Sequence, residues 1–342
     1  MAPKEPEAPP ESGEGRAERL LTSRDTLDRA RALRLLERRD IPSRQALLLR
    51  ALKDRSNYIA AAAAQILADC AEEPSLSAMR ERFCFLAQDG LKRDPGCHIR
   101  SHLAIAFGRL AYTPAIADLR EGLQTVQIEP VAGIPTDTAV HLRANCALAL
   151  GALHDFNAIR DVAVLLFTPS DNLDCAKAAV RSLAMMGHES CLIPLHLALC
   201  GIGTMPAELL EECMAADVEL EDPRAVEVLT PFLHGSNPGL AAFAAIMVAR
   251  TRAPEAADIL LEAIDRFRAE NLEAVALAVC AMRTEGSVKA AAEMLQSARS
   301  DVRLAVLAAM AETGPVVETS VLQKMVGEDP DREVRKAAAQ LC

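Results

Sequence analysis

Aromatic side chains are scarce in this sequence of 342 residues: only 3% of the residues are Phe, Tyr or Trp, and Trp is absent. Half of the residues are hydrophobic, and most of these are Ala and Leu, which head the helix-propensity ranking. The residues that favour strands, such as Val, Ile and Tyr, are few by comparison. This composition argues against a β-sandwich or a β-barrel and predicts an all-α protein.

Signals for membrane insertion and secretion are also missing. No run of about 18 apolar residues occurs, so we expect no helix that crosses a membrane and no membrane partner. The first 15 residues lack the apolar core of a secretory signal. None of the ten cysteines forms a C-x-x-C pair, and most lie in apolar helical stretches. We therefore expect reduced thiols and a cytoplasmic location.

The sequence has fewer basic than acidic residues, but its basic residues are concentrated near the N-terminus. The formal net charge of −11 argues against a nucleic-acid partner. Residues 1–15 are rich in Pro, Glu and Gly, and we expect them to form a disordered acidic tail. In residues 16–55, which we expect to form capping helices, basic residues outnumber acidic ones twelve to six. This segment either docks an acidic partner or forms the solvated outer face of a cap.

A helical pattern recurs along residues 56–342. An apolar residue is followed by Arg, and eight positions after the Arg comes a small residue, as in Leu142–Gly151. Counted from the opening residue, positions 0, +3, +4, +7 and +8 form one face of a helix. The small residue at +9 allows another helix to approach closely. A degenerate copy places Met214 and Ala215 at +8 and +9.

Each copy follows a turn rich in Asp, Asn or Pro and a further apolar helix, so each unit is helix, turn, helix. If the Arg normally bonds an Asp of a neighbouring turn, this ladder is interrupted where the copies near residues 60, 176, 241 and 273 lack it.

The turn, the Val/Ile/Leu-Arg pair, the Ala pair and the Leu-Gly ending resemble the HEAT repeat, particularly the short HEAT-like units of phycobilin-lyase-type bacterial proteins. The resemblance covers roughly residues 40–342 and is clearest at 94–111, 137–155, 300–314 and 329–341. It implies a right-handed α-α superhelix, a HEAT/armadillo-like solenoid of about eight helical pairs in which each unit contacts its neighbours.

The second helices of the units are apolar nearly all round, which has two interpretations. Either they pack laterally on one another, or they expose an apolar groove for a helix or peptide of a protein partner. The groove residues would be Ile105, Leu148, Ile246, Leu277, Leu304 and Leu307, with Arg143, Lys177 and Arg181 as polar anchors. Two insertions, 127–136 and 201–206, are either recognition loops or tolerated surface slack.

Catalytic, cofactor-binding and metal-ligating residues are not assigned by any motif. His98 and His102 are spaced for metal binding, but no carboxylate is fixed nearby. One His-Glu pair, His188 with Glu189, is too few for a deoxyhypusine-hydroxylase-type site. The sequence therefore favours a non-enzymatic scaffold without a cofactor. The alternatives are a phycobilin-lyase-type chromophore protein, which leaves lyase activity open, and a HEAT-like DNA glycosylase, which the lack of Trp and the negative charge oppose.

Overall fold

The structure is a computed structural model that describes residues 12–38, 40–168, 173–203, 205–222 and 224–342. The chain divides into two compact units, Met1–Gly187 and His188–Cys342, hereafter unit 1 and unit 2. Helices make up most of both units, which confirms the all-α prediction.

Unit 1 contains eleven described α-helices, three short 3-10 helices and one hairpin. In chain order they are α1 (Gly13–Leu21), α2 (Thr26–Leu36), α3 (Arg44–Ala51), α4 (Asn57–Cys70), α5 (Glu73–Ala87), α6 (Gly90–Arg93), η1 (Pro95–Cys97), α7 (His98–Arg109), η2 (Thr113–Ala115), α8 (Ile116–Leu123), β1 (Ile128–Val131), β2 (Ile134–Asp137), α9 (Val140–Ala152), η3 (Phe156–Ala158), α10 (Ile159–Phe167) and α11 (Asp174–Met186).

Unit 2 contains ten described α-helices and two 3-10 helices. They are η4 (Glu189–Cys191), α12 (Leu192–Leu199), α13 (Ala207–Glu219), α14 (Ala225–Leu233), α15 (Pro238–Thr251), α16 (Ala256–Ala263), η5 (Ile264–Arg266), α17 (Ala269–Met282), α18 (Glu285–Met294), α19 (Ser300–Thr313), α20 (Thr319–Glu328) and α21 (Arg332–Ala339).

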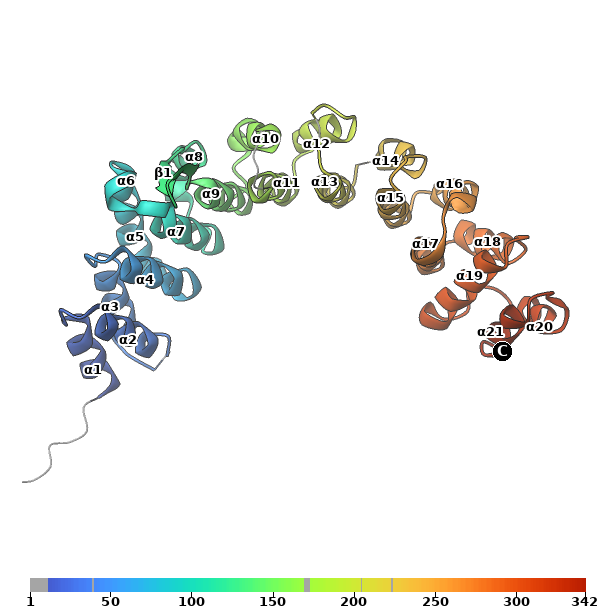
Figure 1. The fold of residues 1–342 in the computed structure, drawn as a ribbon, viewed down its shortest axis with the longest axis horizontal. Helices are drawn as coiled ribbons and strands as arrows, with labels where there is room; N and C mark the ends of the chain where they lie inside the picture. The colour runs from blue at the N-terminus through green and yellow to red at the C-terminus, as the bar shows by residue number, and fades with distance from the viewer. Residues whose placement is uncertain (1–11, 39, 169–172, 204, 223) are drawn as a thin grey trace, which may run out of the picture. The chain divides into compact units, whose positions relative to one another are not determined.

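Within each unit the helices form antiparallel pairs that stack in two layers (Figure 1). In unit 1 the second helices α4, α7, α9 and α11 pack side by side, and in unit 2 the second helices from α13 to α21 do the same. Each unit is therefore an α-solenoid. The described helices give five pairs in each unit, where the sequence indicated about eight in all. One reason for the larger number is that residues 16–55 contain three helices, the last of which, α3, pairs with α4. The other is that the last copy of the repeat forms a complete pair, α20 with α21.

Close packing of the second helices depends on the small residue at position +9. A Cβ added to Gly108 would lie 2.8 Å from the Cα of Ala149, and one added to Gly151 would lie 2.9 Å from the Cα of Ser182. Backbone atoms cannot move aside as a flexible side chain can, so these contacts require glycine. The predicted role of the small residue is confirmed at both positions.

The degenerate copy has a different register from the one expected. After the end of α9, the amide of Asp155 donates a hydrogen bond to the carbonyl of Leu150, which occupies position +8. In unit 2 the amide of Asp222 donates the equivalent bond to the carbonyl of Asp217, so Asp217 corresponds to +8. The small position is therefore Val218, and Ala215 was the wrong assignment. Several small residues follow one another here, so composition alone could not fix the register. Asp217 consequently occupies +8, a position that is apolar in the other copies.

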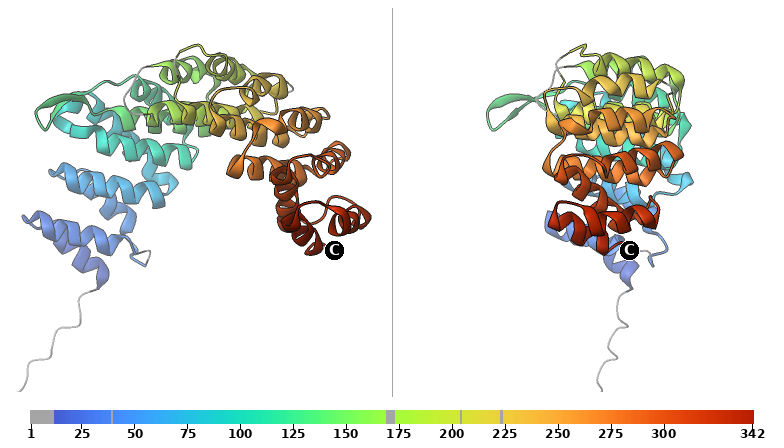
Figure 2. Two further views of the ribbon diagram at one scale, coloured as in Figure 1. Left: turned by 45° about the vertical axis from the view of Figure 1, so that its right-hand side comes forward. Right: turned by 90° about the vertical axis from the view of Figure 1, so that its right-hand side faces the viewer.

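Insertion 127–136, which the sequence had marked only as a loop, forms an ordered β-hairpin. Strands β1 and β2 pair antiparallel, with Val131 opposite Ile134 and Pro130 opposite Pro135. The two connecting residues, Ala132 and Gly133, both have positive φ, as the tight turns that close hairpins require. The hairpin projects from the helical layers of unit 1 (Figure 2).

Buried Arg–Asp ion pairs join helices to turns, as the sequence had suggested. In three of the copies that carry the Arg, its guanidinium lies 2.6–3.0 Å from a carboxylate of a neighbouring turn, whereas Arg335 of the last copy donates to the carbonyl of Asp329. Each such pair satisfies a carboxylate that would be costly to bury alone. The pairs are Arg100 with Asp94, Arg143 with Asp137, and Arg303 with Asp329. Arg29 with Asp54 forms a further pair of the same kind near the N-terminus.

The ends of the predicted segments can be compared with the helices. Helix α1 begins at Gly13, capped by the hydroxyl of Ser12, so it starts within the stretch 1–15 that was expected to be a tail. Residues 1–11 of that stretch lie outside the described residues. Among the helices of the described ranges, none combines the length and the hydropathy needed to cross a membrane.

Candidate functional site

The residues predicted to form a groove lie on the second helices, but they are largely covered by their neighbours. Five of the six apolar side chains are half-buried: Ile105 on α7, Leu148 on α9, Ile246 on α15, Leu277 on α17 and Leu304 on α19. Leu307 is only 1% exposed and packs inside unit 2, so it offers no accessible surface. The first two belong to unit 1 and the others to unit 2.

The three predicted polar anchors all lie in unit 1. Arg143 is committed to local structure, because its guanidinium lies 2.6 Å from Asp137 and donates a hydrogen bond to the carbonyl of Thr125. Lys177 is half-buried and Arg181 is exposed, both on α11. The structure thus gives Arg143 a structural part in holding the base of the hairpin.

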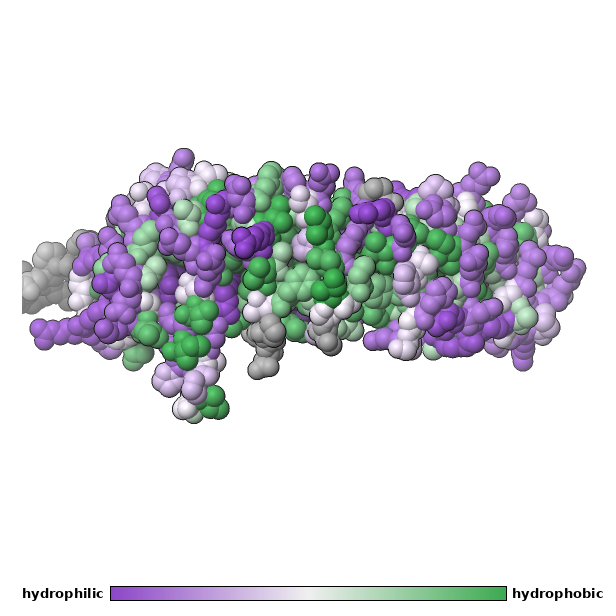
Figure 3. All heavy atoms as spheres, turned by 90° about the horizontal axis from the view of Figure 1, so that it is seen from above, coloured by the Kyte–Doolittle hydropathy of each residue, from purple (hydrophilic) through white to green (hydrophobic). Residues whose placement is uncertain are grey.

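Exposed apolar side chains of unit 1 gather around the hairpin instead. Five of them, each 49–67% exposed, define what we call the hairpin patch: Leu91, Val126, Ile128, Val131 and Ile134. Figure 3 shows hydrophobic side chains on and beside the projecting segment at the lower left of the view. An exposed cluster of large apolar residues is typical of an interaction surface.

The edges of the hairpin are unsuited to pairing with a further strand. In a two-residue hairpin with this register, the outward-facing backbone amides belong to alternate residues, which include Pro130 and Pro135. Proline has no amide hydrogen, so each edge lacks a donor at its centre. A partner would therefore contact side chains of the hairpin rather than extend its sheet.

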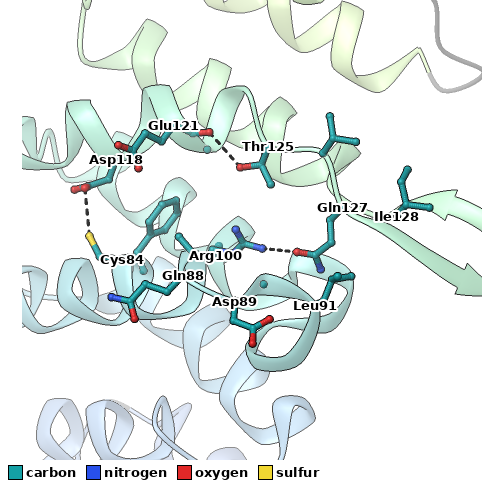
Figure 4. A pocket seen from close by; sticks show the side chains of 15 residues that line it. Cys84, Gln88, Asp89, Leu91, Arg100, Asp118, Glu121, Thr125, Gln127 and Ile128 are labelled. Atoms are coloured by element: carbon teal, nitrogen blue, oxygen red, sulfur yellow. Dashed lines mark hydrogen bonds between the residues drawn. The ribbon is translucent and has the colours of Figure 1, made fainter.

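A pocket of about 610 Å³ opens beside the hairpin patch. Helices α5, α6 and α8 and the segment that leads into β1 form its walls. In Figure 4, Asp118 and Glu121 lie on one side and Asp89 on the other, with the bond between Arg100 and Gln127 between them. The pocket therefore combines apolar walls with a rim that carries three carboxylates.

A buried hydrogen-bond network forms the floor of this pocket. Arg100 donates to Asp94 at 3.0 Å and to the side-chain oxygen of Gln127 at 2.9 Å. The Gln127 amide in turn donates to the Asp94 carbonyl at 3.1 Å. Gly90 covers this network so closely that an added Cβ would lie 2.2 Å from the Gln127 oxygen. The floor is thus rigid, and its arginine is fully engaged.

Two carboxylates anchor the base of the hairpin. Burial alone would raise the pKa of Glu129, but hydrogen bonds from Gln127, Thr138 and the Gly96 amide hold it below its ordinary value. Burial is likewise outweighed at Asp137, where backbone amides and Arg143 lower the pKa. Both groups are therefore held as carboxylates, and they tie the hairpin to the helical layers.

The thiol in the pocket is not an activated nucleophile. Burial and a hydrogen bond to Asp118, 3.2 Å from its sulfur, raise the pKa of Cys84 to about 11. A nucleophilic cysteine needs the opposite shift. All ten cysteines are free, in agreement with the expected reduced state.

One group of side chains in the described residues is arranged as metal ligands could be. His196, Asp217 and Asp222 each present a donor atom, and these atoms all lie within 4.8 Å of one another. The group lies in unit 2. The two histidines whose spacing was noted in the sequence, His98 and His102, are not part of such a group among the described residues.

Part of the basic charge in residues 16–55 is structural. Arg29 is 3% exposed and pairs with Asp54 at 2.9 Å. Arg55 donates to the carbonyl of Arg24. These arginines stabilise the N-terminal helices, whereas Arg31 and Arg38 remain largely exposed.

Sequence reasoning missed two features that the structure brings together. The hairpin patch was flagged only as an insertion, although the apolar residues on both sides of Ala132-Gly133 were a signal for a hairpin. The group of His196, Asp217 and Asp222, hereafter the histidine group, was missed because its first and last members are 26 residues apart in the sequence. A polar residue inside an apolar helical run, as at His196 and Asp217, was the available signal.

Comparison with known proteins agrees with the fold. Residues 267–341 match the family model of HEAT repeats. No curated protein matches the sequence. A Kap121p mutant is similar in structure, with a TM-score of 0.58 and 12% identity over 97% of this chain. Kap121p bound to Nup53p gives 0.52 and 13% over 95%. This chain spans about two fifths of Kap121p, 40% and 41% in the two structures.

The complex of CpcE and CpcF of phycocyanin lyase from Nostoc sp. PCC7120 is more distant. Its TM-score is 0.38, with 16% identity over 87% of this chain and 94% of that one. At this level it carries no argument about function.

Stacked antiparallel helix pairs define the class of the protein as an α-helical repeat protein. Residues 267–341 match HEAT repeats, and the described helices share the α-solenoid fold of the Kap121p structures.

Proposed function

We propose that this protein is a non-enzymatic scaffold and that unit 1 binds a segment of a protein partner at the hairpin patch and the adjoining pocket. The observation that carries the proposal is the concentration of exposed apolar side chains beside a pocket with a rigid floor. Burying such side chains contributes roughly 25 cal/mol per Å² of apolar surface, which makes the patch a source of binding energy.

The partner segment would carry both apolar and basic residues. Glu121 brings negative charge to the pocket rim, where Asp89 is paired with Lys92, and the chain as a whole has a net charge of −11. Complementary charge on a partner speeds association and disfavours acidic competitors. The proline residues on both hairpin edges favour contacts through side chains, so an amphipathic helix fits better than an added strand.

Affinity purification from the native host tests the proposal. The wild-type chain is compared with the double variant Ile128→Asp/Ile134→Asp, which places charge on the patch without altering the helical layers. We expect proteins that co-purify with wild type to be lost from the variant. The matched control is Val164→Asp, since Val164 on α10 of the same unit is 59% exposed and lies outside the patch.

A second variant distinguishes binding at the hairpin patch from binding at the row of second helices. Leu148→Asp alters the half-buried face of α9, and circular dichroism checks that the chain still folds. If a folded Leu148→Asp chain loses the partner while the hairpin variant retains it, the binding site is the second-helix row with Ile105 and Leu148, and the hairpin patch is not the site. The chromophore-protein and DNA-glycosylase alternatives gain no support from a particular residue.

A further inference from the structure

Two buried carboxylates and one histidine meet in the first helical pair of unit 2. His196 lies on α12, Asp217 on α13, and Asp222 in the turn that leads to α14. The side chains of Asp217 and Asp222 are 0% and 1% exposed, and that of His196 is 16% exposed. Three segments of the chain thus converge on one point through polar side chains.

The imidazole cannot satisfy both carboxylates. Its Nε2 atom lies 2.7 Å from an oxygen of Asp217 and 2.9 Å from an oxygen of Asp222, yet it carries at most one hydrogen. Among the described atoms, Oδ2 of Asp217 is buried without a hydrogen-bond partner, and Oδ2 of Asp222, the oxygen 2.9 Å from Nε2, receives no hydrogen bond from it. Arg224 does not fill this gap, because its side chain is 65% exposed and its Nε lies 3.9 Å from Oδ1 of Asp222.

The corresponding position in unit 1 is neutral overall. There the fifth residue of α8 is Arg120, which forms a double hydrogen bond with Asp155 in the turn after α9, and the +8 position is Leu150. In unit 2 the matching residues are His196, Asp222 and Asp217. An arginine has become a histidine and a leucine has become a second carboxylate. At this position unit 2 therefore holds two buried carboxylates where unit 1 holds one, and a histidine where unit 1 has an arginine.

We propose that His196, Asp217 and Asp222 bind a divalent transition-metal ion such as Zn²⁺. One imidazole nitrogen and two carboxylates are a donor set that this ion accepts, and a divalent cation balances the two aspartates. Donors around such an ion lie about 3.0–3.5 Å apart, so each carboxylate oxygen would move away from Nε2, from which the two now lie 2.7 and 2.9 Å, when the ion binds. The ion would link α12, α13 and the following turn.

Access to the site is available from one side. His196 lines a pocket of about 590 Å³ that also includes Cys200, Arg224 and Glu227. The histidine of the group therefore borders an open space, whereas neither aspartate lines it.

Zinc titration of the full chain tests the site. Because the exposed thiols of Cys200 and Cys342 can bind zinc themselves, the experiment uses a Cys200→Ser/Cys342→Ser background. We expect calorimetry to show one Zn²⁺ per chain. Asp217→Asn and His196→Gln should each weaken binding by more than about tenfold, since removal of supporting groups alone costs that much. His234→Gln, which alters an exposed histidine of the same unit, should bind as the background does.

Two further readouts keep the test decisive if a site variant folds poorly. Circular dichroism reports folding of each variant, and Co²⁺ added to the background should give visible absorption bands that Zn²⁺ removes and millimolar Mg²⁺ does not. The proposal is overturned if the background binds no zinc, if folded Asp217→Asn binds it equally well, or if Mg²⁺ displaces Co²⁺. In that event the three side chains form only a hydrogen-bonded network.

Discussion

The two units are built from the same paired helices, but one buried acidic group of unit 2 lacks the arginine that accompanies Asp94 in unit 1 and Asp329 in unit 2. In unit 1 the carboxylate of Asp94 meets the guanidinium of Arg100 and two backbone amides. In unit 2 the carboxylates of Asp217 and Asp222 share a single imidazole nitrogen. A helical repeat therefore tolerates a buried acid at its turn when an arginine accompanies it, and substitution of that arginine leaves a charge that needs another partner.

The first and largest expected effect is the loss of an arginine in unit 1. Arg100→Met leaves Asp94 buried without its guanidinium, so we expect the free energy of unfolding to fall by about 3–5 kcal/mol. Chemical denaturation followed by circular dichroism measures the change. Lys336→Met, which removes an exposed pair with Glu333, should cost less than about 1 kcal/mol. Equal effects of the two variants would contradict the structural importance of the buried pair.

The next effect compares two glycines that lie in helices of different units. Gly151→Ala forces a Cβ against the backbone of Ser182, so we expect a loss of about 1–3 kcal/mol. Gly327 on α20 has no atom within 4 Å of its added Cβ, and Gly327→Ala should instead stabilise by up to about 1 kcal/mol through helix propensity. The same denaturation measurement checks both. A stabilising Gly151→Ala would show that the second helices are not in close contact there.

A third substitution restores in unit 2 the residue type found in unit 1. Asp217→Leu places an apolar side chain at +8, as at Leu150, and leaves the imidazole of His196 to Asp222 alone. In protein freed of metal with a chelator, we expect unfolding to become less favourable by about 1 kcal/mol, because an unsatisfied buried carboxylate oxygen is removed. A destabilised Asp217→Leu chain would mean that the buried acid is well satisfied without metal. The matched control is Leu150→Asp in unit 1, which should destabilise.

The repeat pattern allowed the all-α solenoid, the role of Gly108 and Gly151 and the Arg–Asp pairs to be predicted from the sequence, because each depends on residues at fixed spacing. The hairpin patch could not be predicted, since its side chains are exposed only because Gln127 and Asp137 hold the insertion away from the helices. The histidine group was also out of reach. It depends on the register of α13, which a run of small residues left ambiguous, and on packing between residues that are distant in sequence.

The smallest expected effect concerns pH and the attachment of the hairpin in unit 1. A carboxyl group whose pKa is lower in the folded chain binds protons less readily there, so its stabilising effect is present above the ordinary carboxyl pKa. The lowered pKa of Glu129 and Asp137 therefore predicts that the hairpin loosens as the pH falls below about 4. The protection factor of the Thr138 amide in hydrogen exchange measures this loosening, because it is corrected for the intrinsic pH dependence of exchange; this amide donates to the Gln127 carbonyl at 2.8 Å. Glu129→Gln should lower the protection factor at neutral pH and weaken its pH dependence, whereas Glu121→Gln, at the exposed pocket rim, should change neither. If the protection factor at Thr138 is unaffected by pH and by Glu129→Gln, the hairpin is held by backbone pairing alone, and unit 1 then owes the shape of its patch to the turn rather than to its buried charges.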